Sequence, residues 1–206
     1  MTKVTLLGDS IRLIGYGKSV PELLGSEFSV YQPADNCRYS KYTLRGLYEW
    51  QNDMKGSTIV HWNNGLWDSC DLFGEGLFTP EEEYVNNMLQ IADILIANYG
   101  RVIFATTTPV LSKNEFNKNA DIKRYNDIIV PLLKEKGVVI NDLHSVVSQD
   151  IERYIRHDDC VHLSDEGIEV CSQRVAEVIK TVSQKECTDK RYLGYEMKLK
   201  QIGLPV

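Results

Sequence analysis

The sequence lacks an apolar run of the ~18–20 residues that a membrane-spanning helix needs. It also lacks an excess of positive charge, because 23 lysines and arginines stand against 29 aspartates and glutamates, for a net charge of -6. A nucleic-acid partner or an anionic membrane surface would call for a basic face, so neither is expected. The first predicted strand starts almost at Met1 and leaves no room for a signal peptide. We therefore expect a cytoplasmic protein.

Paired cysteines, internal repeats and low-complexity tracts are also missing. The five cysteines are scattered, with no Cys-x-x-Cys pair, which argues against a zinc site or a dithiol redox site. In a reducing compartment such residues serve as small apolar side chains. At 206 residues the chain fits one domain, predicted here for residues 1–183. The polar, basic stretch at residues 184–206 is then a tail, packed on that domain or on the partner subunit of a homo-oligomer.

Short apolar, β-branched runs alternate along the chain with amphipathic stretches of helical spacing. The clearest helical stretches cover residues 81–98, 125–136 and 166–181. The apolar runs predict strands at Val4–Leu7, Phe28–Tyr31, Thr58–Trp62, Val102–Thr106 and Val138–Ile140. Strands that alternate with helices form right-handed βαβ units, so we predict a parallel sheet covered by helices on both faces. In such sheets ligands bind beyond the carboxyl ends of the strands.

Gly8-Asp9-Ser10 follows the first predicted strand directly, and an amphipathic stretch comes after it. Ser10 is therefore expected at a strand-to-helix turn, where unpaired backbone N–H groups and the helix dipole favour negative charge. A serine hydroxyl at this place has a source of oxyanion stabilisation, although it is a weak nucleophile until a base takes its proton. A serine at a helix start is also an ordinary N-cap, so the tripeptide alone does not decide between the two roles.

Asp159 and His162 are three positions apart, just before the last predicted helix. This spacing lets the Asp159 carboxylate reach Nδ1 of His162 and leaves Nε2 free to face Ser10. The aspartate would fix the tautomer of the imidazole and stabilise the imidazolium formed during attack. One alternative is a histidine that only packs at the helix entry. A metal cluster that also uses His157 and Asp158 is a weaker alternative, because those two residues fit a solvated loop.

Two asparagines, Asn63 and Asn64, follow the third predicted strand. A side-chain amide beside a reacting carbonyl can donate a hydrogen bond to the developing oxyanion, and losing such a donor costs about 10²–10³ in rate. The alternative is a pair of strand-end asparagines that make an Asx turn before Gly65. We assign the oxyanion contact to Asn63, which lies closer to the strand end, and a turn role to Asn64.

The serine, the asparagine and the Asp-x-x-His pair all fall at or beyond the carboxyl ends of predicted strands, and together they predict a serine hydrolase. The same residues resemble the SGNH (GDSL-type) hydrolases, whose blocks centre on Gly-Asp-Ser, a glycine, Gly-x-Asn-Asp and Asp-x-x-His. Ser10, Asp159 and His162 match these blocks without change. His61 and Asn64 stand where the family has glycine and aspartate.

The resemblance implies a flavodoxin-like three-layer α/β/α sandwich with a five-stranded parallel sheet, and no cofactor or metal. It implies Ser10 as nucleophile, with Asp159 and His162 as its base machinery. The N–H groups of Ser10 and Lys41 and Nδ2 of Asn63 would hold the oxyanion. Lys41 is placed by register in the poorest matching block, residues 36–41, where the family has a glycine.

We expect an esterase that hydrolyses a small acyl group such as acetyl, carried on a carbohydrate. Two alternatives stay open. One is an acyltransferase that uses the same residues with a hydroxyl acceptor, and the other is a non-catalytic protein that keeps the pocket as a ligand-binding site. Trp62 and Trp67 flank the Asn63 turn and are the candidates for lining the substrate pocket, with core packing as the alternative role.

Overall fold

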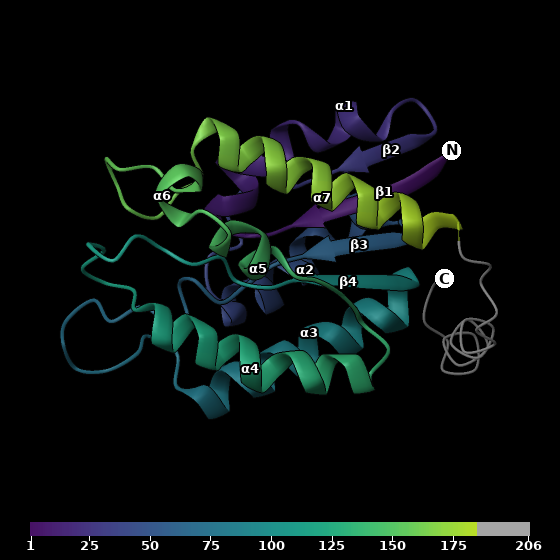
Figure 1. Cartoon of the computed structure of the whole chain (residues 1–206). Helices are drawn as coiled ribbons and strands as arrows, with labels where there is room; N and C mark the ends of the chain where they lie inside the picture. Colours follow the sequence, from purple (N-terminus) through teal and green to yellow (C-terminus); the bar gives the residue numbers. More distant parts are fainter. Residues whose placement is uncertain (185–206) are drawn as a thin grey trace.

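Five parallel strands form one sheet in the order β2-β1-β3-β4-β5 (Figure 1). The computed structural model describes residues 1–184. The strands are β1 (Thr2–Leu7), β2 (Phe28–Tyr31), β3 (Ile59–Trp62), β4 (Arg101–Ala105) and β5 (Val139–Asn141). The strand order changes direction between β1 and β3, so the carboxyl ends of these two neighbours form the crevice in which parallel sheets bind ligands.

Helices cover both faces of the sheet (Figure 1). One face carries α1, α5 and α7, and the other carries α2, α3 and α4. The helices are α1 (Val20–Leu24), α2 (Ser40–Met54), α3 (Glu81–Tyr99), α4 (Asn119–Glu135), α5 (Leu143–Ser148), α6 (Ile151–Tyr154) and α7 (Asp165–Gln184). Each face buries its own apolar cluster against the sheet. The fold is therefore the predicted three-layer α/β/α sandwich with a five-stranded parallel sheet.

All five predicted strands are confirmed to within one or two residues, but helix α2 was not predicted. The three helices found from the sequence have stripes of leucine, isoleucine and valine, which give a clear periodic signal. The buried stripe of α2 instead includes Ser40, Thr43 and Gly46 beside Leu47 and Trp50. These polar and small residues make α2 less apolar than the three predicted helices, so its stretch was not recognised from its apolar residues.

The segment after Ser10 also differs from the expected helix start. Residues Ile11–Gly15 form one turn of π-helix, Tyr16–Lys18 form a turn of 3-10 helix (η1 and η2), and a short α1 follows. Arg12 is the physical reason, because its fully buried guanidinium turns inward to the carbonyls of Gly8, Pro33 and Asp35.

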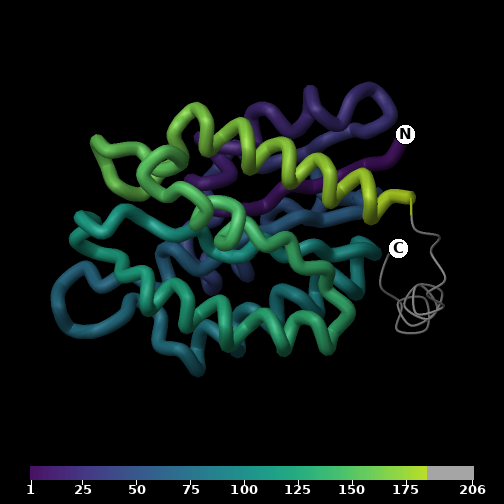
Figure 2. Tube along the Cα trace, in the orientation of Figure 1, coloured from purple at the N-terminus to yellow at the C-terminus, as the bar shows by residue number. Residues whose placement is uncertain are grey.

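The two ends of the described chain lie together at the amino ends of the strands, away from the crevice (Figure 2). The predicted tail at residues 184–206 begins at the last residue of α7, and its remaining residues, 185–206, lie outside the described part of the chain. Within residues 1–184, none of the helices combines the length and the apolar character needed to cross a membrane.

Candidate active site

The structure brings the predicted serine and asparagine to neighbouring strand ends. Ser10 follows β1 and Asn63 follows β3, at the point where the strand order changes direction. Asp159 and His162 lie in the segment between α6 and α7, and this segment reaches the same end of the sheet (Figure 1). Residues from three distant parts of the sequence therefore meet at one crevice.

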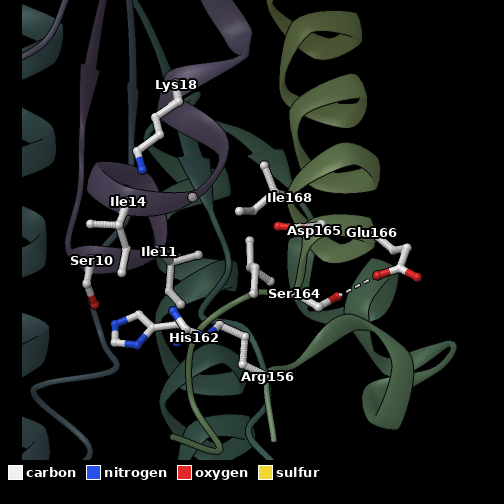
Figure 3. Close-up of a pocket in the computed structure, with 12 residues that line it drawn as sticks. Ser10, Ile11, Ile14, Lys18, Arg156, His162, Ser164, Asp165, Glu166 and Ile168 are labelled. Atoms are coloured by element: carbon white, nitrogen blue, oxygen red, sulfur yellow. Dashed lines mark hydrogen bonds between the residues drawn. The ribbon is translucent and has the colours of Figure 1, made fainter. Parts of the chain in front are cut away.

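The Ser10 side chain is not used as a helix cap. Ser10 has helical backbone angles (φ -63°, ψ -26°) and precedes the π-turn, but its hydroxyl makes no capping hydrogen bond. The hydroxyl instead points toward the imidazole of His162 (Figure 3). The N-cap alternative for this serine does not apply, and its hydroxyl is available to react.

Asp159 holds the imidazole of His162 from one side. Oδ2 of Asp159 lies 2.9 Å from Nδ1 of His162, and Oδ1 accepts the backbone N–H groups of Val161 and His162, each at 2.9 Å. Because Nδ1 is engaged by the carboxylate, Nε2 is the nitrogen left to face the serine. Both side chains stay partly exposed, at 26% for His162 and 32% for Asp159, so substrate can reach the pair.

Asp159 remains a carboxylate because donors surround it. Partial burial alone would raise its pKa, but the backbone N–H groups of His162 and Val161 and then the His162 side chain outweigh burial and lower the pKa. The turn that presents these donors is bent at Cys160, which has a left-handed backbone (φ 62°) unusual for a residue other than glycine. Hydrogen bonds from Cys160 N–H to Arg156 and from Leu111 N–H to Cys160 fix this bend.

The two asparagines have different surroundings. Asn63 is 5% exposed, and its Oδ1 accepts a hydrogen bond of 2.8 Å from the hydroxyl of Tyr16. Asn64 is fully buried and uses both ends of its amide: Oδ1 accepts from Thr43 and Nδ2 donates to the carbonyl of Arg38. Asn64 thus ties the β3 turn to the start of α2, while Asn63 lies beside the crevice.

Lys41 is the second residue of α2, so its backbone N–H belongs to the first helical turn, where N–H groups have no partner within the helix. Its side chain is exposed and pairs with Glu83 at 2.9 Å. The turn before Lys41 is attached to the Ser10 segment, because Cys37 N–H donates to Gly8 and Gly8 N–H donates to Sγ of Cys37. An oxyanion role for Lys41 would thus use its backbone N–H and not its side chain.

A cavity of about 460 Å³ opens between the Ser10 segment and the start of α7 (Figure 3). Ser10 and His162 lie in its wall, so a molecule bound in the cavity would lie beside both side chains. Its lining combines an apolar part with ionic and hydroxyl groups. The apolar part is formed by Ile11, Ile14, Leu163 and Ile168, and the polar part includes Lys18, Arg156, Ser164, Asp165 and Glu166.

The expectation that Trp62 lines the pocket is wrong. Trp62 is fully buried on β3 and packs against Phe104 of β4, with ring centroids 4.8 Å apart. Its position inside a strand with both faces covered directs the indole into the core. Trp67 is 38% exposed beyond the Asn63 turn, although it is not part of the 460 Å³ cavity.

Sequence reasoning missed three buried polar residues that support the crevice. Arg12 binds the carbonyls of Gly8 and Asp35, Tyr16 binds Asn63, and Asp68 accepts both the N–H and the hydroxyl of Ser40. The available signal for Arg12 was a charged residue inside an apolar stretch. Tyr16 and Asp68 gave no comparable signal, because their partners are distant in the sequence.

No protein-family model matches the chain. Among curated proteins, the chain is 29% identical over 168 residues to GDSL esterase/lipase WDL1 of Oryza sativa subsp. japonica, over 74% of this chain. The chain spans 64% of the length of that relative.

Among solved structures, a lipase/acylhydrolase from Enterococcus faecalis superimposes with a TM-score of 0.72 at 18% identity, covering 88% of this chain and 96% of that one. An acetylxylan esterase from Geobacillus stearothermophilus superimposes with a TM-score of 0.73 at 15% identity, covering 92% and 97%. At these identities the solved structures establish the fold.

The fold and the crevice define the class of three-layer α/β/α sandwiches with a serine beyond the first strand and an Asp-x-x-His pair before the last helix. Together with the relative among curated proteins, these features confirm the predicted resemblance to the SGNH (GDSL-type) hydrolases.

Proposed function

We propose that this protein is a carboxylic ester hydrolase that uses Ser10 as nucleophile, His162 as general base and Asp159 as the residue that orients the base. The observation that carries the proposal is the arrangement of one imidazole between a carboxylate and a free hydroxyl. Asp159 lies 2.9 Å from Nδ1 of His162, and the Ser10 hydroxyl faces the same ring from inside the cavity (Figure 3). Base and nucleophile with a third orienting group form the arrangement that activates a serine.

The proposed reaction proceeds through an acyl-enzyme. Nε2 of His162 takes the proton from the Ser10 hydroxyl as its oxygen attacks the ester carbonyl, and the resulting imidazolium is stabilised by Asp159. The backbone N–H groups of Ser10 and Lys41 and Nδ2 of Asn63 donate hydrogen bonds to the oxyanion. The imidazolium then protonates the leaving alcohol. Water, deprotonated by the same histidine, releases the acid and restores the serine.

We further propose a small acyl group such as acetyl, on a carbohydrate, as the substrate. The cavity beside Ser10 supports a polar alcohol, because ionic side chains and a hydroxyl line it beside four aliphatic ones. Several solved structures with this fold are acetylxylan esterases, which supports an acetylated sugar as the class to test first. A sugar offers hydroxyl groups to the polar wall and a ring face to the aliphatic one.

A covalent label and one substitution test the proposal. We expect a fluorophosphonate probe to label the wild-type protein and not the Ser10→Ala variant, and we expect Ser10→Ala to lose hydrolysis of p-nitrophenyl acetate. The fold should persist, because the Ser10 hydroxyl makes no capping bond whose loss would cost stability. Ser19→Ala is the matched control, since Ser19 lies in the same segment and also makes no side-chain capping bond. Equal labelling and activity in Ser10→Ala and wild type would refute the esterase proposal.

A further inference from the structure

Tyr16 is a buried polar residue to which the proposed reaction gives no role. Its ring is fully buried and packs edge-on against His61, with centroids 5.6 Å apart. Its hydroxyl donates to Oδ1 of Asn63 at 2.8 Å, and its carbonyl accepts a hydrogen bond from Ser172 of α7. Burial raises the pKa of Tyr16 well above 10, so the phenol keeps its proton and remains able to donate.

The orientation of the Asn63 amide decides whether this residue can stabilise an oxyanion. Only the NH₂ end of an amide donates hydrogen bonds, and the two ends have nearly the same shape, so neighbouring polar groups must set the orientation. An amide with its oxygen turned toward the crevice would repel the oxyanion. A residue that holds the oxygen elsewhere therefore contributes to catalysis without touching the substrate.

Two neighbours, Tyr16 and Asp9, fix the orientation of the Asn63 amide in this protein. Tyr16 donates to the oxygen end, and that oxygen lies so close to Gly8 that a Cβ on Gly8 would fall 2.0 Å from it. The Asp9 carboxyl is fully buried, which raises its pKa, and the neighbouring Asn63 side chain opposes this rise. A carboxylate only accepts hydrogen bonds, so the end of the amide that faces Asp9 is the NH₂ end. An NH₂ group has two hydrogens, and one remains for the crevice.

We propose that Tyr16 is a positioning residue that locks Oδ1 of Asn63 away from the crevice and so directs Nδ2 to the oxyanion. The inference rests on the proposed function, because it assumes that Asn63 acts as an oxyanion donor. It adds a residue that lies six positions beyond the nucleophile and acts only through Asn63.

A double-mutant cycle on p-nitrophenyl acetate tests this inference. Tyr16→Phe removes only the hydroxyl oxygen and is expected to lower kcat about 10-fold with little change in KM. This loss is smaller than the loss of about 10²–10³ in rate that removal of an oxyanion donor causes. In the Asn63→Ala background the same substitution is expected to change kcat less than about 2-fold, because the group that Tyr16 orients is gone.

Tyr84→Phe is the matched control. Tyr84 is also fully buried, and its hydroxyl donates a hydrogen bond of 3.3 Å to the carbonyl of Asn64, the residue after Asn63 in the same turn. Tyr84→Phe is expected to lower Tm while it keeps kcat within about 2-fold of wild type in both backgrounds.

The outcomes separate the inference from the function on which it rests. Tyr16→Phe with wild-type kcat, or with the same loss in both backgrounds, would overturn the role of Tyr16 and leave the esterase proposal intact. Asn63→Ala with wild-type kcat would refute the oxyanion assignment and the inference with it.

If Tyr16→Phe does not fold, Asp9→Asn tests the other end of the Asn63 amide, because an amide at position 9 can donate to the oxygen of a flipped Asn63. We expect a kcat loss that disappears in the Asn63→Ala background, and an equal loss in both backgrounds would overturn the inference.

Discussion

Asp159 divides its two oxygens between two tasks. Oδ1 accepts two backbone N–H groups and so shapes the turn, while Oδ2 takes Nδ1 of His162. One residue therefore fixes both the position of the histidine and its tautomer. The two tasks can be separated by a substitution that keeps one acceptor oxygen and replaces the other with a donor.

Asp159→Asn makes this separation. The remaining amide oxygen can still accept the Val161 and His162 N–H groups, so the fold is expected to stay close to wild type. The NH₂ group would donate to Nδ1 of His162 and leave the proton on Nε2, which then cannot accept the serine proton. We expect kcat for p-nitrophenyl acetate to fall by about 10⁴, as in serine enzymes with the equivalent change. A loss below about 10-fold, with an unchanged melting curve, would count against the orienting role.

Asn63 and Asn64 offer a second contrast between neighbouring residues. Asn64→Ala removes the acceptor of Thr43 and the donor to Arg38 inside the core, so a stability loss of about 1–3 kcal/mol is expected. Its kcat should stay near wild type at temperatures well below Tm. Asn63→Ala should instead lower kcat by about 10² or more with little change in KM. Michaelis curves and thermal melts of both variants decide the matter, and the reverse pattern would show that Asn64 is the oxyanion donor.

At the scale of elements, helix α2 begins with a cap supplied by another loop. Its N-cap residue, Tyr39, makes no side-chain capping bond. Both oxygens of the fully buried Asp68 instead lie 3.0–3.1 Å from the Ser40 N–H, and one of them accepts the Ser40 hydroxyl. A carboxylate at a helix N-terminus is also favoured by the helix dipole. Asp68 thereby joins the β3 turn to the helix that carries the Lys41 N–H.

This cap should make stability depend on pH. Burial raises the pKa of Asp68 to about 6, against about 3.8 for an ordinary aspartate, and its hydrogen bonds to Ser40 and Thr79 oppose the rise. Between pH 3.8 and about pH 6, the folded state therefore keeps a proton on Asp68 that the unfolded state has released. The stabilisation by the protonated group is complete below pH 3.8 and is lost as the pH rises to about 6, by at most roughly 1.4 kcal/mol per pH unit.

Urea unfolding of wild type and Asp68→Asn at pH 4, 5, 6 and 7 measures this contribution. The difference in unfolding free energy, wild type minus variant, is expected to decrease from pH 4 to pH 6 and to stay constant above pH 6. Using the difference removes the contribution of the other titrating groups. Parallel curves for the two proteins across the whole range would contradict the raised pKa.

The elements differ in how well the sequence predicts them. The strands and the three long helices follow from apolar periodicity, because burial on both faces or on one stripe leaves a regular pattern. Helix α2 and the π-turn after Ser10 depend on partners that lie elsewhere in the sequence, namely Asp68 for Ser40 and the carbonyls of Pro33 and Asp35 for Arg12. Contacts between distant residues leave no periodic signal, which is also why the roles of Tyr16 and Asp68 could not be predicted.

The candidate site was predictable to the extent that it is local. Asp159 and His162 are three residues apart, and the short turn between them is sufficient to bring them together, as the sequence spacing predicts. The placement of Ser10 and Asn63 follows from the rule for carboxyl ends of parallel strands. Trp62 was assigned to the pocket because it adjoins Asn63, but alternation along β3 turns it into the core beside Phe104.

At the scale of the whole molecule, Ser10 and His162, the proposed nucleophile and base, are held together by packing between distant segments. Ser172 of α7 donates to the carbonyl of Tyr16, 156 positions away, and Lys180 donates to the carbonyl of Leu23 at 2.8 Å. Activity should therefore disappear only when the domain unfolds. We expect residual esterase activity and the far-UV circular dichroism signal to have the same urea midpoint. Activity lost at a clearly lower urea concentration would mean that the segment before α7 detaches by itself.

The same arrangement sets the order in which the protein acquires its chemistry during synthesis. The ribosome delivers the serine among the first residues, while the histidine follows only after more than a hundred further residues have emerged. Domains fold as units as the chain lengthens, and the last helix must dock before serine and imidazole meet. A nascent or truncated chain would thus carry an inert hydroxyl, and the proposed hydrolysis would begin only on a finished fold.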